Sequence, residues 1–435
     1  MKLEHHLTNV KAKEDTRKTG LQASLGLFDA VAVSVGAIIG GGIFVVTGVA
    51  AGVAGSAVVV SMVVAACVSL LTALSFCELA AWQPLEGSIY EYSYRLISPF
   101  AGFLTGWMWV LSNTFAGAAV ALGFAYYLNA LYPILPTNII AALIAAGFTV
   151  FNYLGTRQSA NLNNFLVAAK LLILAFFVAF GISFIQNANY MPFQPFQTGV
   201  LLGAVYIFFA YGGFARAAVI AEEIKDARRN VPRAILIALA ISTVIYVLVG
   251  LVAVGLMGAN GLSASNSPLK DAMAVTGNNA AVALISVGGM LATASVLLTS
   301  ILGVSRMAYA MARRNDLPQA LSKLHPKHNT PYYAVWIVGA ATVLLALIGD
   351  VSRVVVVSSF AMLFFYTLAN VAAFRFEPQK RVYPRFLPAI GAVTCIAFLA
   401  FTFFASIESW TVGVACLIMG ALYYFAKQKL SKASK

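Results

Sequence analysis

The sequence predicts an all-α polytopic membrane protein with twelve transmembrane helices. Its 435 residues are 61% hydrophobic and only 10% charged, and the mean hydropathy is +0.86. Soluble proteins are about 25% charged, so lipid is the expected solvent for much of this chain. A transmembrane helix needs about 20 mostly apolar residues, and the uncharged runs accommodate about twelve such segments.

Polar or turn-forming residues separate the predicted spans. The spans are 26–53, 57–78, 98–127, 137–155, 161–185, 199–221, 234–257, 280–304, 332–349, 354–374, 386–407 and 409–426. A turn-rich segment from Pro84 to Tyr90 follows the second span, and residues 305–318 are predicted to form a short cytoplasmic helix and loop. The ends, 1–24 and 427–435, are polar tails.

The distribution of positive charge agrees with this count. With the N-terminus inside, 24 of the 28 Lys and Arg fall in cytoplasmic segments, and two, Lys270 and Arg353, fall outside. The remaining two, Lys170 and Arg216, lie within spans. This asymmetry follows the positive-inside rule, and a single miscounted span would have mixed the two populations. Both termini are therefore predicted to be cytoplasmic, in a multi-pass protein of the plasma membrane.

Composition and charge placement also exclude several classes of protein. The net charge of +13 is spread over loops that face the anionic leaflet, so no basic domain for nucleic acid is expected. The four cysteines lie in apolar segments and predict neither a disulfide framework nor a metal site. No histidine lies in a predicted span, which argues against an intramembrane enzyme. A membrane sensor is a remote alternative because the cytoplasmic segments are too short for a signalling domain. The first twenty residues do not resemble a secretory signal.

Two predicted spans have glycine-rich interruptions. The first contains Gly36 and then Gly40, Gly41 and Gly42 in a row, and the second contains Gly212 and Gly213. Each interior glycine costs a helix about 1 kcal/mol relative to alanine, so spans one and six are predicted to be discontinuous. An unwound backbone is tolerated within a membrane only where protein buries it or it lines a cavity. The alternative is a helix-packing surface, because small residues also let helices approach closely.

The two interruptions predict an inverted repeat. The second interrupted span begins five spans after the first, on the opposite side of the membrane, because five is odd. The predicted units are residues 25–190 and 191–376, followed by two further helices in 377–426. Paired interrupted helices in two inverted halves are the sequence feature that best indicates a transport site.

Backbone groups at the two interruptions are suited to binding a zwitterion. The half-helix that begins at the first interruption has a positive end, and the N–H groups of Gly41, Gly42 and Ile43 could bind a carboxylate. Carbonyl groups of Ile39, Phe209, Ala210 and Gly212 could accept an ammonium group. An amino acid is therefore the expected substrate. The predicted substrate-binding residues are Ile39, Gly40, Gly41, Gly42, Ile43, Phe209, Ala210, Tyr211, Gly212 and Gly213.

Four segments resemble motifs of the amino acid–polyamine–organocation (APC) superfamily of permeases. They are 36–44 in span one, 74–90 after span two, 209–233 around span six, and 305–318 followed by Thr330-Pro331. The resemblance extends from about residue 25 to residue 375. It implies a leucine-transporter-like fold of two inverted five-helix units plus two extra helices. It also implies uptake or exchange of amino acids or amines.

The chain departs from the family pattern at two places. Asp226-Ala227 replaces the usual Asn-Pro after the sixth helix. Arg216 lies close to where many members have an acidic residue, which weakens the case for cationic substrates. Arg216 could bind an acidic side chain of a substrate, or it could pair with Asp29 or Glu78 to close the inner gate. The pairing is favoured because a buried charge usually needs a partner.

Lys170 is the other charge within a span, about 13 Å from the cytoplasmic end of the fifth helix at 1.5 Å per residue. A lysine at this depth could lie in a water-filled vestibule with no coupling role. It could instead carry a proton, because burial disfavours the charged ammonium. In proton-coupled members of the resembled family, such a lysine stands where sodium binds in sodium-driven relatives. The resemblance then implies contacts with the Gly36 carbonyl and Ser295.

These observations predict a secondary active transporter that moves amino acids by alternating access, as an amino acid/proton symporter. An exchanger on the same scaffold is the alternative. No cofactor, metal or sodium ion is expected, the proton being the coupling ion. The expected partners are the amino acid substrate and the lipid bilayer, with no nucleic acid and no obligate protein partner.

Overall fold

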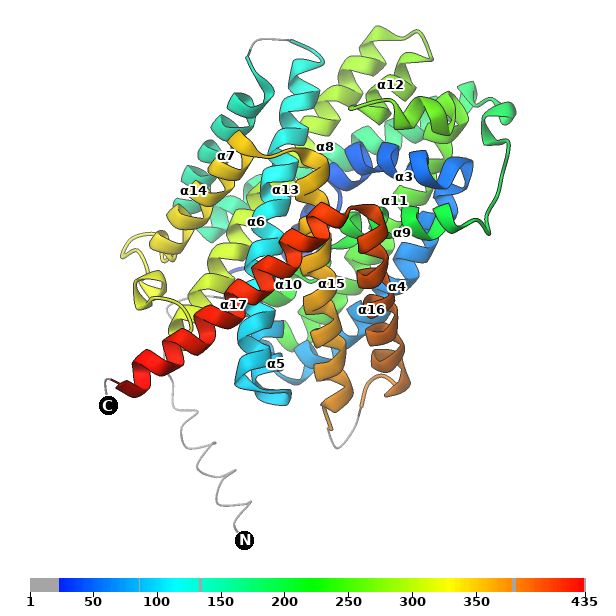
Figure 1. The fold of residues 1–435 in the computed structure, drawn as a ribbon. Helices are drawn as coiled ribbons and strands as arrows, with labels where there is room; N and C mark the ends of the chain where they lie inside the picture. Colours follow the sequence, from blue (N-terminus) through cyan, green and yellow to red (C-terminus); the bar gives the residue numbers. More distant parts are fainter. Residues whose placement is uncertain (1–22, 86, 133–134, 378–380, 434–435) are drawn as a thin grey trace.

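The computed structural model describes residues 23–85, 87–132, 135–377 and 381–433, which form one helical bundle (Figure 1). Within these ranges the structure contains helices and no β-strand, apart from one isolated parallel bridge between Leu25 and Ile224. The predicted tails, 1–24 and 427–435, lie partly outside the described residues. The short helices α5 (Ile89–Leu96) and α12 (Pro268–Ala274) lie at opposite ends of the bundle (Figure 1).

Long apolar helices make up most of the bundle, as the uncharged runs predict. They are α4 (Val58–Trp82), α6 (Pro99–Asn129), α7 (Thr137–Tyr153), α8 (Thr156–Gly181), α11 (Ala227–Ser263), α13 (Asn279–Arg313), α14 (Tyr332–Ile348), α15 (Val351–Arg375), α16 (Phe386–Ala405) and α17 (Ile407–Ala433). In the described part of the chain, eight helical stretches are long and apolar enough to cross a membrane, and three shorter apolar helices accompany them. The protein is therefore a polytopic membrane protein.

The first predicted interruption is present. Helix α2 (Leu27–Ile38) ends before Ile39, whose backbone is extended at φ −81° and ψ 102°. A π-helical turn, η1 (Gly42–Val46), then leads into α3 (Thr47–Ala54). The chain turns at Gly55, which has a φ of 62°, and continues into α4. The helix therefore breaks at the glycine-rich segment and resumes after it.

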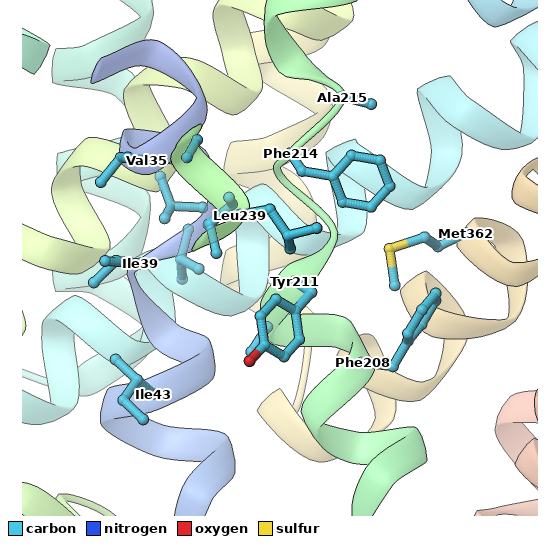
Figure 2. Packing of buried hydrophobic residues seen from close by; sticks show 14 of the residues in the cluster. Val35, Ile39, Ile43, Phe208, Tyr211, Phe214, Ala215, Leu239 and Met362 are labelled. Carbon is cyan, nitrogen blue, oxygen red and sulfur yellow. The ribbon is translucent and has the colours of Figure 1, made fainter. Parts of the chain in front are cut away.

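The second predicted interruption is also present. Helix α9 (Thr198–Tyr211) ends at Tyr211, and only one turn, α10 (Arg216–Val219), follows the break. Figure 2 shows the ribbon from Tyr211 to Ala215 without a helical coil, with Met362 of α15 beside it. A Cβ atom placed on Gly212 would lie 2.3 Å from the Met362 sulfur, so a larger residue here would displace the Met362 side chain.

Several helix ends differ from the sequence-based prediction, three of them at buried or charged residues. Residues 305–313 continue α13 as one helix, although a separate short helix was expected there. The reason is that Arg306, on this last part of α13, is fully buried and its Nε lies 2.7 Å from a carboxylate oxygen of Glu223. Helix α4 likewise continues past Glu78, which is buried. Helix α11 begins seven residues before its predicted start, with Pro232 tolerated near its N-terminus.

Ion pairs and backbone bonds hold one end of the bundle together. The N–H groups of Ser24 and Leu25 both donate to the Glu223 carbonyl at 3.0 Å. The guanidinium of Arg314, after α13, binds the Glu91 carboxylate of α5. These contacts join the chain before α2, the chain after α10, α5 and the end of α13.

Candidate functional site

The two interruptions pack directly against each other. A Cβ atom on Gly213 would lie 2.2 Å from the Ala37 carbonyl carbon, and one on Gly42 would lie 2.2 Å from the Ala210 Cβ. Such distances are shorter than any real contact, so only glycine fits at both positions. The glycine segments therefore form both of the predicted features, a broken helix and a surface where two helices pack closely.

A narrow cavity of about 40 Å³ lies between the interruptions and is completed by α6, α13 and α15. Its lining comprises Ala37, Ile38, Gly41, Gly42, Ser112, Asn113, Ala116, Val120, Phe209, Ala210, Gly212, Gly213, Arg216, Val296, Ser300, Ser358 and Met362. Six of the ten predicted substrate-binding residues are among them. The other four, Ile39, Gly40, Ile43 and Tyr211, do not line this cavity.

The carbonyl groups predicted to bind an ammonium are already occupied by donors of the protein. The Ile39 carbonyl accepts from Lys170, and the Phe209 carbonyl accepts from the Gly212 N–H at 3.1 Å. The Ala210 carbonyl accepts from the Tyr246 hydroxyl at 3.1 Å, and the Gly212 carbonyl from the Tyr366 hydroxyl at 2.9 Å. The prediction that these carbonyls accept a substrate ammonium therefore concerns their remaining lone pairs.

Lys170 is fully buried and its ammonium binds at the first interruption. The Nζ atom donates to the Ser295 hydroxyl at 2.6 Å and to the carbonyls of Ile39, Gly36 and Val35 at 2.5, 3.2 and 3.4 Å. The contacts with Gly36 and Ser295 are those that the sequence predicted. All four partners are neutral oxygens, which is also the ligand type of an alkali-metal site. The described residues contain no group of three His, Cys, Asp or Glu that could hold a metal ion.

Arg216 does not make the predicted gate pair. Its Nη2 donates to the Asn113 side-chain oxygen at 2.6 Å, and its guanidinium carbon lies 5.0 Å from the centre of the Trp109 ring. The two carboxylates have other partners, because backbone N–H groups of Val382 and Tyr383 donate to Glu78. Asp29 accepts from the Gly26 N–H at 2.9 Å and the Asn164 amide at 2.8 Å. A pairing of Arg216 with Asp29 or Glu78 is therefore not formed here.

Two tyrosines that the sequence analysis missed stabilise the interruptions. The buried Tyr246 hydroxyl of α11 donates to the carbonyls of Ile38 at 2.7 Å and Ala210 at 3.1 Å, one from each interruption. The Tyr366 hydroxyl of α15 binds the second interruption at Gly212. A tyrosine in an apolar run gives no sequence signal of such a role, because most buried tyrosines lie in ordinary cores.

Comparison with known proteins identifies the family. The family described as amino acid permease matches residues 25–425. A branched-chain amino acid permease of Bacillus subtilis is 31% identical over 431 residues, covering 93% of each chain. A methylthioribose transporter of the same organism is 31% identical over 435 residues, covering 94% of each chain. An uncharacterized transporter of Mycobacterium tuberculosis is 34% identical over 418 residues, covering 95% of this chain and 93% of the relative.

These matches cover nearly the whole helical bundle and both interruptions, so they concern the site as well as the fold. The relatives are transporters, in agreement with the prediction that the chain is not an enzyme. The chain belongs to the amino acid permease family of the APC superfamily.

Proposed function

We infer that this protein is a secondary active transporter that moves amino acids across the plasma membrane by alternating access. The observation that supports this most strongly is the shared cavity between two interrupted helices. Discontinuous helices that meet at mid-membrane are the usual substrate site of secondary transporters. The family match supports the substrate class, and one relative, from Bacillus subtilis, is a branched-chain amino acid permease.

The substrate carboxylate is proposed to bind at Gly41 and Gly42. Both residues line the cavity, and η1 and α3 continue from them as thirteen helical residues. The first N–H groups of such a segment lack intrahelical partners and form the positive end of its dipole. Because the carbonyls at the second interruption have donors already, the substrate ammonium would share them with Tyr246 and Tyr366.

We further propose that Lys170 couples transport to a proton. Its four hydrogen-bond partners are neutral oxygens, so the ammonium is held without a counter-charge. Lys170 binds the Ile39 carbonyl, whereas the neighbouring residues Ile38 and Gly41 line the cavity. Proton binding and substrate binding would therefore act on the same stretch of backbone. With a lysine in this place, sodium coupling is not proposed.

The proposed topology is twelve transmembrane helices with both termini in the cytoplasm. Residues 25–190 and 191–376 would form the inverted leucine-transporter-like repeats, and 377–426 the two additional helices. The placement of α5 and α12 at opposite ends of the bundle supports it, because the positive-inside rule puts Arg95 and Lys270 on opposite sides (Figure 1).

The test is uptake by proteoliposomes that contain the purified protein. A panel of radiolabelled amino acids is offered at acidic and neutral external pH, with the internal pH fixed. We expect accumulation of some members of the panel, faster at acidic external pH. Vesicles preloaded with substrate distinguish the alternative, an exchanger, which would take up label only when internal substrate is present. Absence of uptake for every amino acid under all conditions would contradict the proposed function.

A further inference from the structure

The Arg216 guanidinium has hydrogen-bond donors for which the described residues provide no acceptor. The side chain is only 4% exposed and lines the cavity between the two interruptions. Its Nη2 binds Asn113, whereas its Nε and Nη1 are buried and have no hydrogen-bond partner. A buried guanidinium with unused donors is costly to maintain, because it has lost its water without gaining a full set of acceptors.

Other arginines near the same end of the bundle are paired with carboxylates. Arg306 binds Glu223, Arg313 lies 3.4 Å from Glu222, and Arg314 binds Glu91. Arg216 differs from all three, since no salt bridge to it is found within the described residues. Its neighbours are the neutral Asn113 amide and the face of Trp109. None of the carboxylates in the described part of the chain supplies the counter-charge, so the site is suited to an anionic group on a bound ligand.

A glycine on α13 leaves the space that the Arg216 guanidinium occupies beside the cavity. A Cβ atom on Gly303 of α13 would lie 2.1 Å from Nη1, so any larger residue would displace the group. One turn earlier on the same face of α13, Ser300 lines the cavity, and its hydroxyl is also buried without a partner. Two donors with unused capacity, one of them charged, thus lie in one cavity on neighbouring elements.

We propose that Arg216 and Ser300 bind the side-chain carboxylate of an acidic amino acid, so that the transported substrates are aspartate or glutamate. This inference rests on the proposed amino acid transport. Arginine and a carboxylate form paired, charge-assisted hydrogen bonds through Nη2 together with Nε or Nη1. Nη2 of Arg216 has a second N–H besides the one that binds Asn113, so such a pair can form with the unused Nε or Nη1 donor. The α-carboxylate would remain at Gly41 and Gly42, where no side-chain charge is needed. An anionic side chain would also neutralise Arg216 inside the membrane.

The test compares acidic amino acids with their neutral amides in proteoliposomes. Initial uptake of L-aspartate and L-glutamate is measured against L-asparagine, L-glutamine and L-alanine, for the wild type and for Arg216→Gln, Arg216→Lys and Ser300→Ala. The wild type should prefer the acidic members. Arg216→Gln should lose at least about tenfold in kcat/KM for them while keeping uptake of the amides. Arg313→Gln, which removes a guanidinium outside the cavity, is the matched control and should leave the preference unchanged.

Each outcome has a defined meaning. If the wild type moves neutral but not acidic amino acids, the proposal for Arg216 is wrong and amino acid transport stands. If no amino acid moves, the transport assignment fails and this inference fails with it. If Arg216→Gln remains folded but loses acidic and neutral substrates equally, Arg216 binds the α-carboxylate and the proposal is overturned. Should Arg216→Gln not fold, the substrate preference of the wild type and the smaller loss expected for Ser300→Ala decide the question.

Discussion

Replacing Lys170 with alanine should remove proton coupling while leaving the protein folded. The Gly36 carbonyl keeps the Ser295 hydroxyl at 3.2 Å, and the Val35 carbonyl keeps the Ile39 N–H at 2.9 Å. The Ile39 carbonyl loses its short bond from the ammonium, which costs about 1–3 kcal/mol for a buried acceptor. Removal of a buried cation offsets part of this loss. The expected net destabilisation is therefore at most about 3 kcal/mol.

The assay is accumulation driven by a pH gradient with the membrane potential clamped at zero. One pH unit stores about 1.4 kcal/mol per proton, which corresponds to about tenfold accumulation for one proton per substrate. The wild type should approach that ratio, whereas Lys170→Ala should equilibrate substrate without concentrating it. Exchange between labelled and unlabelled substrate should persist in the variant, because the cavity lining is unchanged.

Lys270→Ala is the control for loss of a lysine, because Lys270 is part-exposed and its Nζ lies 3.0 Å from Asp271. This variant should accumulate substrate as the wild type does. If Lys170→Ala concentrated substrate to the wild-type ratio, the coupling role would be refuted. If it lost exchange as well as accumulation while remaining folded, Lys170 would be needed for the transport cycle itself rather than for the proton.

Three further perturbations have expected outcomes. Gly213→Ala places a Cβ atom 2.2 Å from the Ala37 backbone, so it should destabilise the fold by about 1–3 kcal/mol in thermal unfolding and abolish uptake. Gly147→Ala is the control, because Gly147 is exposed within α7 and a Cβ atom there meets nothing within 4 Å; this change should be neutral or stabilising. Tyr246→Phe removes the hydroxyl that joins the two interruptions, so it should lower the unfolding free energy by about 1–3 kcal/mol and slow transport. It is measured beside Tyr211→Phe, whose hydroxyl donates to the Met62 carbonyl at a longer 3.5 Å. Burial raises the pKa of Asp316 above its usual 3.8, although the Tyr90 hydroxyl bond opposes this. The folded state therefore binds the Asp316 proton more readily than the unfolded state does, so the free energy of unfolding should fall as pH rises from 3.8 through the raised pKa. Melting temperature measured as a function of pH should show this fall for the wild type and not for Asp316→Asn.

The helices and the two interruptions could be predicted because their causes are local. An apolar run must be helical in lipid, so the predicted spans 137–155 and 332–349 differ from α7 and α14 by at most two residues at either end. Adjacent glycines disfavour a helix, and both predicted glycine segments are broken, although Gly288 and Gly289 lie within the continuous helix α13. The contacts of Lys170 with Gly36 and Ser295 followed from the resemblance to a known family, not from the local pattern.

The remaining features depend on contacts between distant segments. Charged residues were taken as ends of spans, yet Arg306 extends α13 because Glu223, distant in sequence, neutralises it. The carbonyls of the interruptions were expected to accept a substrate ammonium, and no feature of the sequence indicated that Tyr246 and Tyr366 from other helices donate to two of them. The predicted carboxylate partner of Arg216 was wrong for the same reason, because the guanidinium donates to Asn113 of α6 instead. Spacing along the chain does not report which side chain fills a gap between helices.

Loss of a proton from Lys170 would change the number of hydrogen bonds that its amino group donates to the first interruption. An ammonium group has three N–H donors, and a neutral amine has two donors and one lone pair. The amino group lies within hydrogen-bond distance of three carbonyls and the Ser295 hydroxyl, so loss of a proton leaves fewer donors than acceptors. The Ser295 hydroxyl, which also donates to Gly36 at 3.2 Å, could then turn toward the amine lone pair.

In the proposed mechanism, this change weakens the attachment of Gly36 and Ile39 to α8 and α13. Tyr246 binds the neighbouring Ile38 carbonyl and the Ala210 carbonyl, so movement of the first interruption is passed to the second. Gly213 packs against Ala37 without space for a methyl group, which makes independent movement of the two segments unfavourable. Proton release should therefore displace both walls of the cavity together. Lys170 can then control substrate release without contacting the substrate.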